Sequence, residues 1–238
     1  MSPMPAADAR ASHRTKQEFV YHTIRRAILR CDLQPGERLV IEDIAQQLKV
    51  SSIPVREALQ LLQSEGLVVT VPHVGATVAP LSRESIIDLF TIMEGLQLVA
   101  ARTAAERGAP DEFRALEQLV VDMDRAVTGG RLEDWSELNT EFHLAIARMA
   151  RLPLLLQMTE QVFDRWDRTR RYFFRCVLSQ RMPNAQAEHR AIVSAITRRA
   201  VDELPALMRD HNQNAMRAYL AHLDAQPAGR RPGSGDAA

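Results

Sequence analysis

Residues 50–67, VSSIPVREALQLLQSEGL, decide how the first third of this chain is interpreted. Their apolar side chains recur at the spacing of one buried helix face, and polar side chains occupy the opposite face. The apolar set is Val55, Ala58, Leu59 and Leu62, and the polar set is Ser52, Arg56, Gln60 and Gln63. Ser51 or Ser52 is suited to cap this helix, and Gly66 to end it. A short helix with such a polar outer face predicts contact with a polar partner.

The segments on either side of this helix predict a winged helix-turn-helix. Upstream, residues 15–30 and 41–48 each carry a helical apolar stripe, and a tight turn at 49–51 joins the second stripe to the polar-faced helix. Downstream, the β-branched runs LVVTVP and ATVAP flank residues 73–75. They predict a small hairpin in which Gly75 is free to adopt a positive φ.

The first eighty residues resemble the DNA-binding domain of the GntR superfamily of bacterial regulators. The matching positions are Leu33, Pro35, Gly36, Leu39, Ala45, Val50, Ser51, Pro54, Val55, Arg56, Glu57, Ala58, Leu59, Glu65, Gly66, Leu67 and Gly75. The resemblance implies that the second helix of the motif enters the major groove of double-stranded operator DNA, while the wing reaches the neighbouring backbone or minor groove. The expected DNA contacts are Ser51, Ser52, Ile53, Arg56, Gln60, His73 and Gly75. A surface ion pair for Arg56 and a plain turn role for His73 are the alternatives.

The charge balance gives little support of its own for nucleic-acid binding. Lysine plus arginine and aspartate plus glutamate number 30 each, and residues 1–80 hold nine basic and eight acidic residues, a net charge of +1. So weak an electrostatic footprint predicts that operator binding needs two subunits acting together. The two cysteines, Cys31 and Cys176, lack metal-type spacing, and the sequence has neither a secretion signal nor an 18-residue apolar run. We therefore expect a cytoplasmic protein with no membrane partner.

The remaining residues predict an all-α bundle, so the expected fold class is mostly α, with a hairpin wing. Breakers divide the segment into helices at 83–107, 111–128, 131–149, 153–179, 184–199 and 201–223. The expected domains are a disordered arm at 1–13, the winged helix-turn-helix at 14–80, the helical domain at 81–224 and a disordered tail at 225–238. A winged helix followed by such a bundle resembles the FCD branch of the GntR superfamily. This resemblance implies a homodimer whose bundle binds a small-molecule effector.

Three histidines in the predicted bundle share helix faces with apolar residues and so point inward. They are His143, His189 and His211. One inward histidine is usually a core residue bonded to a neighbour, but three buried imidazoles are harder to satisfy separately, and a shared divalent ion would satisfy all of them. An unmetallated polar cluster is the alternative.

The FCD resemblance strengthens the metal hypothesis. Many FCD proteins carry an Asp-x-x-Phe-His motif, a Glu-His pair and a later His that bind a metal beside the effector. The segment NTEFH at 139–143, the pair at 188–189 and His211 match this pattern, with Asn139 where Asp is common. The implied ligands are Asn139, His143, His189 and His211, and Zn²⁺ or Ni²⁺ suits an imidazole-rich site. Asn139 supplies a carbonyl oxygen without negative charge, so metal affinity could be lower than in those relatives.

The effector is expected to be a small metabolite, with a carboxylate as one class. The family often carries an arginine on its first bundle helix in the pattern R-x-x-L-E, but the aligned residues here are Met93, Leu96 and Gln97. A replacement cation could come from the arginine- and aromatic-rich segment 165–175, for which we name Arg165, Arg168 and Tyr172. A solvated basic face is the alternative for these residues.

The leading hypothesis is thus a metabolite-responsive transcriptional regulator and not an enzyme. A metal-responsive regulator, in which the ion itself is the signal, is the second hypothesis. A metal-dependent hydrolase is remote, because Glu141 and Glu188 are adjacent in sequence to the expected ligands and should point away from them.

Overall fold

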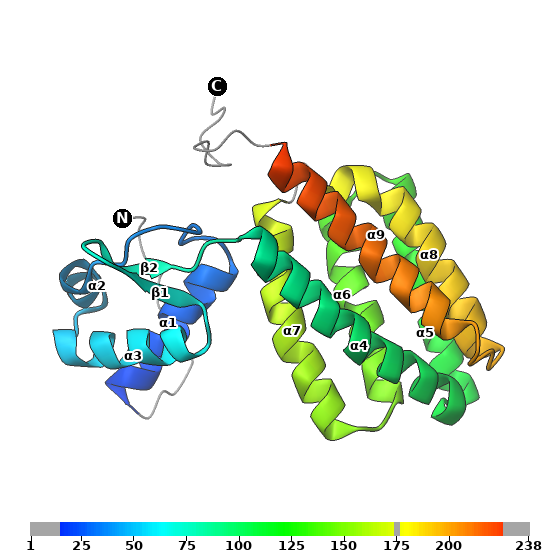
Figure 1. Ribbon diagram of the computed structural model, residues 1–238. Helices are drawn as coiled ribbons and strands as arrows, with labels where there is room; N and C mark the ends of the chain where they lie inside the picture. Colours follow the sequence, from blue (N-terminus) through cyan, green and yellow to red (C-terminus); the bar gives the residue numbers. More distant parts are fainter. Residues whose placement is uncertain (1–14, 174–176, 226–238) are drawn as a thin grey trace. The chain divides into compact units, whose positions relative to one another are not determined.

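The computed structural model describes residues 15–173 and 177–225 (Figure 1). The chain divides into two compact units, Met1–Ser82 and Arg83–Ala238. The expected arm at 1–13 and all of the expected tail except Ala225 lie outside the described residues.

The N-terminal unit contains three helices and a hairpin within its described part. They are α1 (Lys16–Leu29), α2 (Ile41–Leu48), α3 (Ser52–Ser64), β1 (Val68–Val71) and β2 (Gly75–Val78). Thr15 and Glu18 form a capping box at the start of α1. Between α2 and α3, Lys49 adopts a left-handed conformation with φ of 55° and so makes the tight turn of the helix-turn-helix. β1 and β2 pair antiparallel, with Val68 opposite Val78.

The apolar faces of α1, α2 and α3 form one core with the base of the hairpin. Its fully buried members include Ile24, Ile28, Ile44, Val55 and Leu62. At the edge of this core, Tyr21 donates a hydrogen bond to Glu65, which follows α3, and Arg25 lies 3.2 Å from the same carboxylate. These contacts connect α1 to the end of α3 and so help to hold α3 in place, with its polar face exposed.

The C-terminal unit is helical throughout its described part. Its helices are α4 (Arg83–Arg107), α5 (Pro110–Thr128), α6 (Leu132–Met149), α7 (Pro153–Tyr172), α8 (Ser179–Thr197) and α9 (Leu204–Asp224). α4 packs against α6, α7, α8 and α9, and Figure 1 shows it between α7 and α9. The core combines the small residues of α4, such as Ala101 and Ala104, with large ones such as Trp135 and Phe142. A winged helix-turn-helix followed by an all-α bundle confirms the predicted fold class.

Two predicted helix boundaries were wrong. The helix expected at 153–179 ends at Tyr172, and the helix expected to start at 184 begins at Ser179. Pro183, which we interpreted as a breaker, lies early in α8. Pro183 has no backbone N–H to donate to the carbonyl of Ser179 one turn earlier, yet α8 continues through it to Thr197. The residues from Ser179 to Pro183 therefore belong to a helix of the bundle and not to a loop.

Candidate functional site: an exposed recognition helix and a histidine-lined pocket

The polar face of α3 is open to solvent. Ile53, at its start, is 65% exposed, and Arg56 and Gln60 are exposed on the same helix. The opposite face is held in the core by Val55 and Leu62, so the helix cannot turn its polar side inward. This arrangement leaves the expected contact residues accessible to a duplex groove.

The start of α3 and the tip of the wing are accessible too. Ser51 is exposed and Ser52 half-buried, and within the described chain the Ser51 side chain makes no capping hydrogen bond. This corrects the expected serine cap and leaves the first N–H groups of α3 free for an acceptor such as a phosphate. At the wing tip, His73 and Gly75 are exposed with positive φ values of 63° and 96°.

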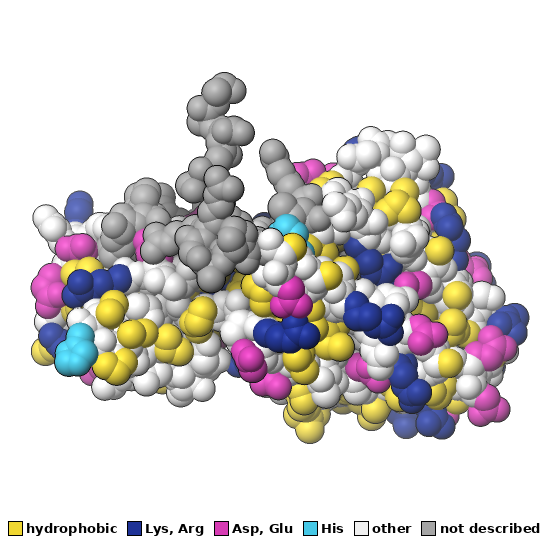
Figure 2. All heavy atoms as spheres, turned by 45° about the horizontal axis from the view of Figure 1, so that its top comes forward, with side chains coloured by type: hydrophobic (Ala, Val, Ile, Leu, Met, Phe, Trp, Pro, Cys, Tyr) yellow, Lys and Arg dark blue, Asp and Glu magenta, His cyan; other side chains and the backbone are white. Residues whose placement is uncertain are grey.

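Arg56 has one acidic neighbour across the turn of the motif. Its Nη2 lies 4.0 Å from Oε1 of Glu42, and both side chains are more than half exposed. An exposed ion pair at this distance is weak and is screened by salt. The guanidinium of Arg56 is therefore available to DNA. On the face shown in Figure 2, basic and acidic side chains are interspersed over the bundle, as the equal totals of the sequence suggest.

In the helical unit, the fold brings the three inward histidines together. His143 comes from α6, His189 from α8 and His211 from α9, and one ring nitrogen of each lies within 4.8 Å of those of the others. All three side chains are buried. Asn139 lies one turn before His143 on α6 and is also buried, at 3% exposure. The set named from the sequence thus gathers at one place.

Neighbouring side chains fix the orientation of two of the rings. His211 Nδ1 lies 2.8 Å from the carboxylate of Glu188, and His189 Nδ1 lies 3.4 Å from the amide oxygen of Gln186. Gln186 is itself held by Trp135 Nε1 at 3.1 Å. With each Nδ1 directed to an oxygen acceptor, Nε2 is the nitrogen left to bind a metal ion.

Glu188 therefore has a different place from the one we expected. Although it is adjacent to His189 in sequence, it faces His211 on the neighbouring helix α9. Arg181 and Asn214 also bond its carboxylate. Burial opposes ionisation of Glu188, but the hydrogen bonds from His211, Arg181 and Asn214 outweigh it and lower the pKa to about 2. A carboxylate engaged in this way supports the ring of His211 and is poorly placed to act as a base.

The donor set fits a divalent ion. His189 Nε2 is buried and has no hydrogen-bond partner among the described residues, which is a costly state for a polar atom. Burial lowers the pKa of both His143 and His189 well below the usual range, and the nearby His211 lowers both further. Neutral imidazoles with free nitrogens that converge in a buried place are what Zn²⁺ or Ni²⁺ requires.

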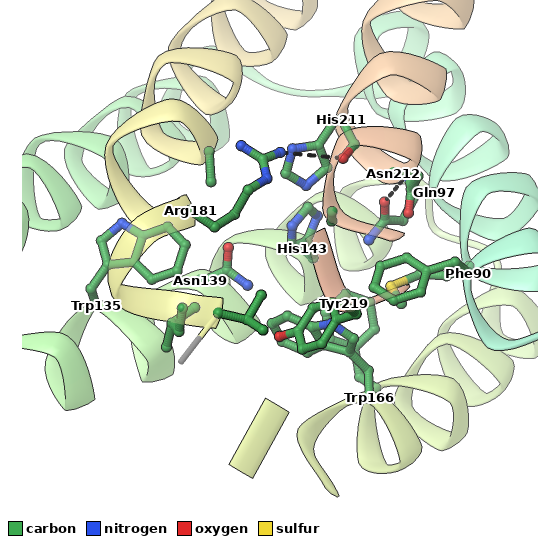
Figure 3. Close-up of a pocket in the computed structure, with 16 residues that line it drawn as sticks. Phe90, Gln97, Trp135, Asn139, His143, Trp166, Arg181, His211, Asn212 and Tyr219 are labelled. Atoms are coloured by element: carbon green, nitrogen blue, oxygen red, sulfur yellow. Dashed lines mark hydrogen bonds between the residues drawn. The ribbon is translucent and has the colours of Figure 1, made fainter. Parts of the chain in front are cut away.

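A pocket adjoins the histidines (Figure 3). Its empty volume, including the opening, is about 470 Å³. Arg181, His143, His211 and Asn139 line one end, and Phe90, Trp166 and Tyr219 lie at the other. Gln97 and Asn212 contribute a further polar wall, joined by a hydrogen bond of 2.7 Å. A pocket with a few polar groups at one end and aromatic walls at the other is typical of small-molecule sites.

The residues proposed from the sequence for effector binding do not line this pocket. On α7, Arg165 is exposed, Arg168 is buried elsewhere and Tyr172 is half-buried. Among the described lining residues the arginine is Arg181, on α8. Sequence reasoning missed it because Pro183 was interpreted as the end of a loop. The regular spacing of Arg181, Ala185 and Glu188 along one helix face was the signal that could have found it.

Comparison with known proteins identifies the two units. The family described as "Bacterial regulatory proteins, gntR family" matches residues 16–78, and the family described as "FCD domain" matches residues 88–214. The chain is a GntR-family regulator with an FCD domain. It is therefore a DNA-binding transcriptional regulator, as the sequence predicted.

Curated relatives agree with this assignment, and a solved structure shares the fold. The chain is 30% identical over 145 residues to the transcriptional regulator McbR of Escherichia coli K12. This match covers 61% of this chain and 66% of McbR. It is 29% identical over 194 residues to the transcriptional repressor RspR of the same organism, a match that covers 82% of this chain and 84% of RspR. The solved structure of E. coli McbR/YncC shares the fold with a TM-score of 0.68 at 22% identity, covering 89% of this chain and 100% of that one.

None of the described helices combines the length and the apolar character that a bilayer crossing requires.

Proposed function

We propose that this GntR-family regulator binds operator DNA as a homodimer and that a small metabolite, bound beside a divalent metal ion in the helical unit, controls its DNA affinity. The observation that carries this proposal is the convergence of His143, His189 and His211 at the end of a pocket. These histidines are buried, so their side chains are not exposed to a duplex, and they lie in the unit that follows the DNA-binding unit.

The metal would be Zn²⁺ or Ni²⁺, held by His143, His189 and His211 with Asn139 as a weaker oxygen ligand. When bound, it would supply a fixed positive charge beside the pocket. The protein's own contribution is to orient the rings of His189 and His211 through Gln186 and Glu188.

The DNA contacts would come from the start and the polar face of α3 and from the wing. Arg56 and Gln60 would reach base edges or phosphates in the major groove, and Ser51, Ser52 and Ile53 would meet the duplex at the helix entrance. His73 and Gly75 would approach the adjacent backbone. Because one unit offers few cations, two copies would be needed for firm operator binding.

Exposed apolar side chains on α4 and α7 suggest where the second copy binds. Ile92 and Val99 on α4 are 54% and 48% exposed, and Leu154 and Met158 on α7 are 68% and 43% exposed. α4 and α7 pack against each other, so these side chains occur on neighbouring helices. Exposed apolar residues gathered on adjacent elements are typical of subunit interfaces.

The test uses the full chain and the DNA upstream of its own gene. We expect fluorescence anisotropy to show specific binding of this DNA by a dimer, with sedimentation velocity giving the mass. Elemental analysis should find about one metal ion per chain, a ratio set by the single three-histidine cluster among the described residues. Metal-free protein that binds the DNA, yet takes up neither Zn²⁺ nor Ni²⁺, would contradict the metal part alone.

A regulator that responds to the metal itself is the second candidate, favoured by the three buried imidazoles that converge at one place. Titrating Zn²⁺ against DNA affinity with no organic ligand present separates the two. A change in DNA affinity of about tenfold or more would favour a metal sensor, since allosteric coupling commonly reaches this size. Little change would favour a metabolite-controlled regulator in which the ion holds the ligand.

A further inference from the structure

Resting on the proposed function, in which the pocket of the helical unit binds a small metabolite, we propose that this metabolite carries a neutral group that both donates and accepts a hydrogen bond, such as a carboxamide or a hydroxyl. The subsite for this group would be Gln97 on α4 and Asn212 on α9. Figure 3 shows the two side chains bonded to each other in the wall of the pocket.

A backbone carbonyl fixes which atom of each amide is nitrogen and which is oxygen. One amide atom of Asn212 lies 2.9 Å from the backbone oxygen of Met208 and 2.7 Å from an amide atom of Gln97. Because a backbone oxygen only accepts hydrogen bonds, this Asn212 atom is the nitrogen Nδ2, and the Gln97 atom that it meets is the oxygen Oε1. The donor Gln97 Nε2 and the acceptor Asn212 Oδ1 are the two amide atoms that remain.

These two remaining atoms face the pocket. Gln97 and Asn212 line it, and the two residues are otherwise buried, at 4% and 2% exposure. Within the described chain neither Gln97 Nε2 nor Asn212 Oδ1 has a hydrogen-bond partner, yet neither belongs to the polar atoms that are sealed from solvent. Their accessible surface is therefore the surface of the pocket. A ligand that displaces water from this wall must replace the hydrogen bonds of that water, because an unsatisfied polar atom is costly.

A donor beside an acceptor selects a neutral ligand group. A carboxylate accepts from Gln97 Nε2 but has no hydrogen to offer Asn212 Oδ1. An ammonium group donates to Asn212 Oδ1 but meets the N–H groups of Gln97 with N–H groups of its own. A carboxamide or a hydroxyl has both a donor and an acceptor, so it satisfies both atoms of the pair.

The surroundings of the pair offer no charge that would change this selection. Phe90 and Met93, the other α4 residues among the described lining residues, are apolar. Arg181 lines the histidine end of the pocket, where it is paired with Glu188. An ion placed against Gln97 and Asn212 would thus lose its water without gaining an opposite charge from this wall.

The experiment uses the full-length chain and four ligands that share a cyclohexyl ring and differ in the head group. Cyclohexanecarboxamide and cyclohexylmethanol donate and accept hydrogen bonds, cyclohexyl methyl ketone only accepts them, and the cation cyclohexanecarboxamidine only donates them. Tryptophan fluorescence reports binding, because both tryptophans of the chain, Trp135 and Trp166, line the pocket.

We expect the carboxamide or the alcohol to bind at least about fivefold more tightly than the ketone and the amidine, since an unsatisfied buried polar atom costs this much or more. The tighter of these two ligands identifies which neutral group the subsite accepts. Zn²⁺-free and Zn²⁺-loaded protein should give the same order of affinities, because neither Gln97 nor Asn212 is an expected metal ligand.

Two variants test the two atoms separately. Asn212→Leu removes the acceptor, so the carboxamide should lose its advantage over the ketone. Gln97→Glu keeps an oxygen for Asn212 Nδ2 but replaces the donor with an acceptor. At about pH 8, where a glutamate is normally ionised, the amidine should then bind at least about tenfold more tightly than the carboxamide. The matched control Gln161→Glu adds the same charge at an exposed position of α7 and should preserve the wild-type order.

The outcomes separate this subsite from the proposed function. The assignment is overturned if the ketone or the amidine binds the wild type as tightly as the carboxamide and the alcohol do, or if both pocket variants keep the wild-type order. The absence of a saturable fluorescence change with the carboxamide and the alcohol at millimolar concentration would overturn it as well. None of these measurements needs DNA or metal. A chain that shows the expected order but does not bind operator DNA would instead contradict the proposed function and leave the subsite intact.

Discussion

The recognition helix α3 and the histidine cluster use polar side chains in opposite ways. Arg56 and Gln60 on α3 are exposed to solvent. In contrast, the three histidines of the cluster are buried, and Gln186 and Glu188 bond to two of their rings. The exposed surface relies on DNA to supply its partners. The buried site must be almost complete before its ligand arrives, because unsatisfied polar groups in an interior are costly.

Removing a ligand from the buried site should give the largest effect. His143→Ala takes away one of three converging imidazoles, so we expect Zn²⁺ affinity to fall by more than about 100-fold, beyond the loss typical of outer residues. Calorimetric titration of metal-free protein measures this change. His73→Ala removes an exposed histidine of the wing and should leave Zn²⁺ affinity unchanged. Equal Zn²⁺ affinity in both variants would show that His143 is not a metal ligand and would contradict the assignment of the metal site to the buried cluster.

A supporting residue should give a smaller loss. Glu188→Gln weakens the hydrogen bond that orients His211, so Zn²⁺ affinity should fall by about 10- to 100-fold. The matched control is Glu141→Gln, two residues before His143 in sequence but paired with Arg148 on the exposed side of α6. We expect Glu141→Gln to bind Zn²⁺ as the wild type does. A loss of the same size in the control would mean that overall charge, and not ring orientation, governs affinity.

On the exposed surface, Arg56→Ala should weaken DNA binding by about 1 to 3 kcal/mol, as expected for one direct contact. The fold should remain intact, because the only ion pair recorded for Arg56 among the described residues is the long exposed one with Glu42. Anisotropy titration with a circular dichroism control measures both. Glu42→Ala removes that acidic neighbour and should leave DNA binding equal or slightly stronger. Unchanged binding in Arg56→Ala would remove this residue from the contact set.

The smallest effect should come from the support behind α3. Tyr21→Phe deletes the hydroxyl that donates to Glu65, and we expect a loss of about 1 kcal/mol in unfolding free energy, in the range for one partly buried hydrogen bond. Denaturant unfolding of the full chain, followed for the transition of the winged unit, measures it. DNA affinity at low temperature should stay near the wild-type value. A tenfold loss of DNA affinity would show instead that the Tyr21 contact positions α3 for its target.

The sequence predicted those features that depend on residues close together in the chain, and it failed for those that depend on distant residues. The helical spacing of Val55, Ala58 and Leu62 was enough to place Arg56 on the outside, since both faces belong to one short helix. The inward direction of His143, His189 and His211 was predictable for the same reason. The expected side-chain cap at the start of α3 was wrong: Ser51 occupies the N-cap position, but its side chain makes no capping hydrogen bond. Such a bond depends on one side-chain rotamer, which helix periodicity does not fix.

The errors in the bundle arose where two elements meet. Pro183 suggested a break, but α8 runs from Ser179 through Pro183, and Arg181 on this helix lines the pocket. Glu188 was expected to point away from the metal site because only its own helix was considered. Its partner His211 lies on α9, 23 residues later in the chain.

By itself, the sequence determined the order of elements, the winged helix-turn-helix with its exposed polar face, and the three inward histidines, because helix periodicity and turn chemistry are local. Only the tertiary structure decided that these histidines converge, which nitrogens their neighbours leave available, and that Arg181 rather than Arg165, Arg168 or Tyr172 lines the pocket. These features depend on how α6, α8 and α9 pack, and packing brings together residues whose separation along the chain carries no signal.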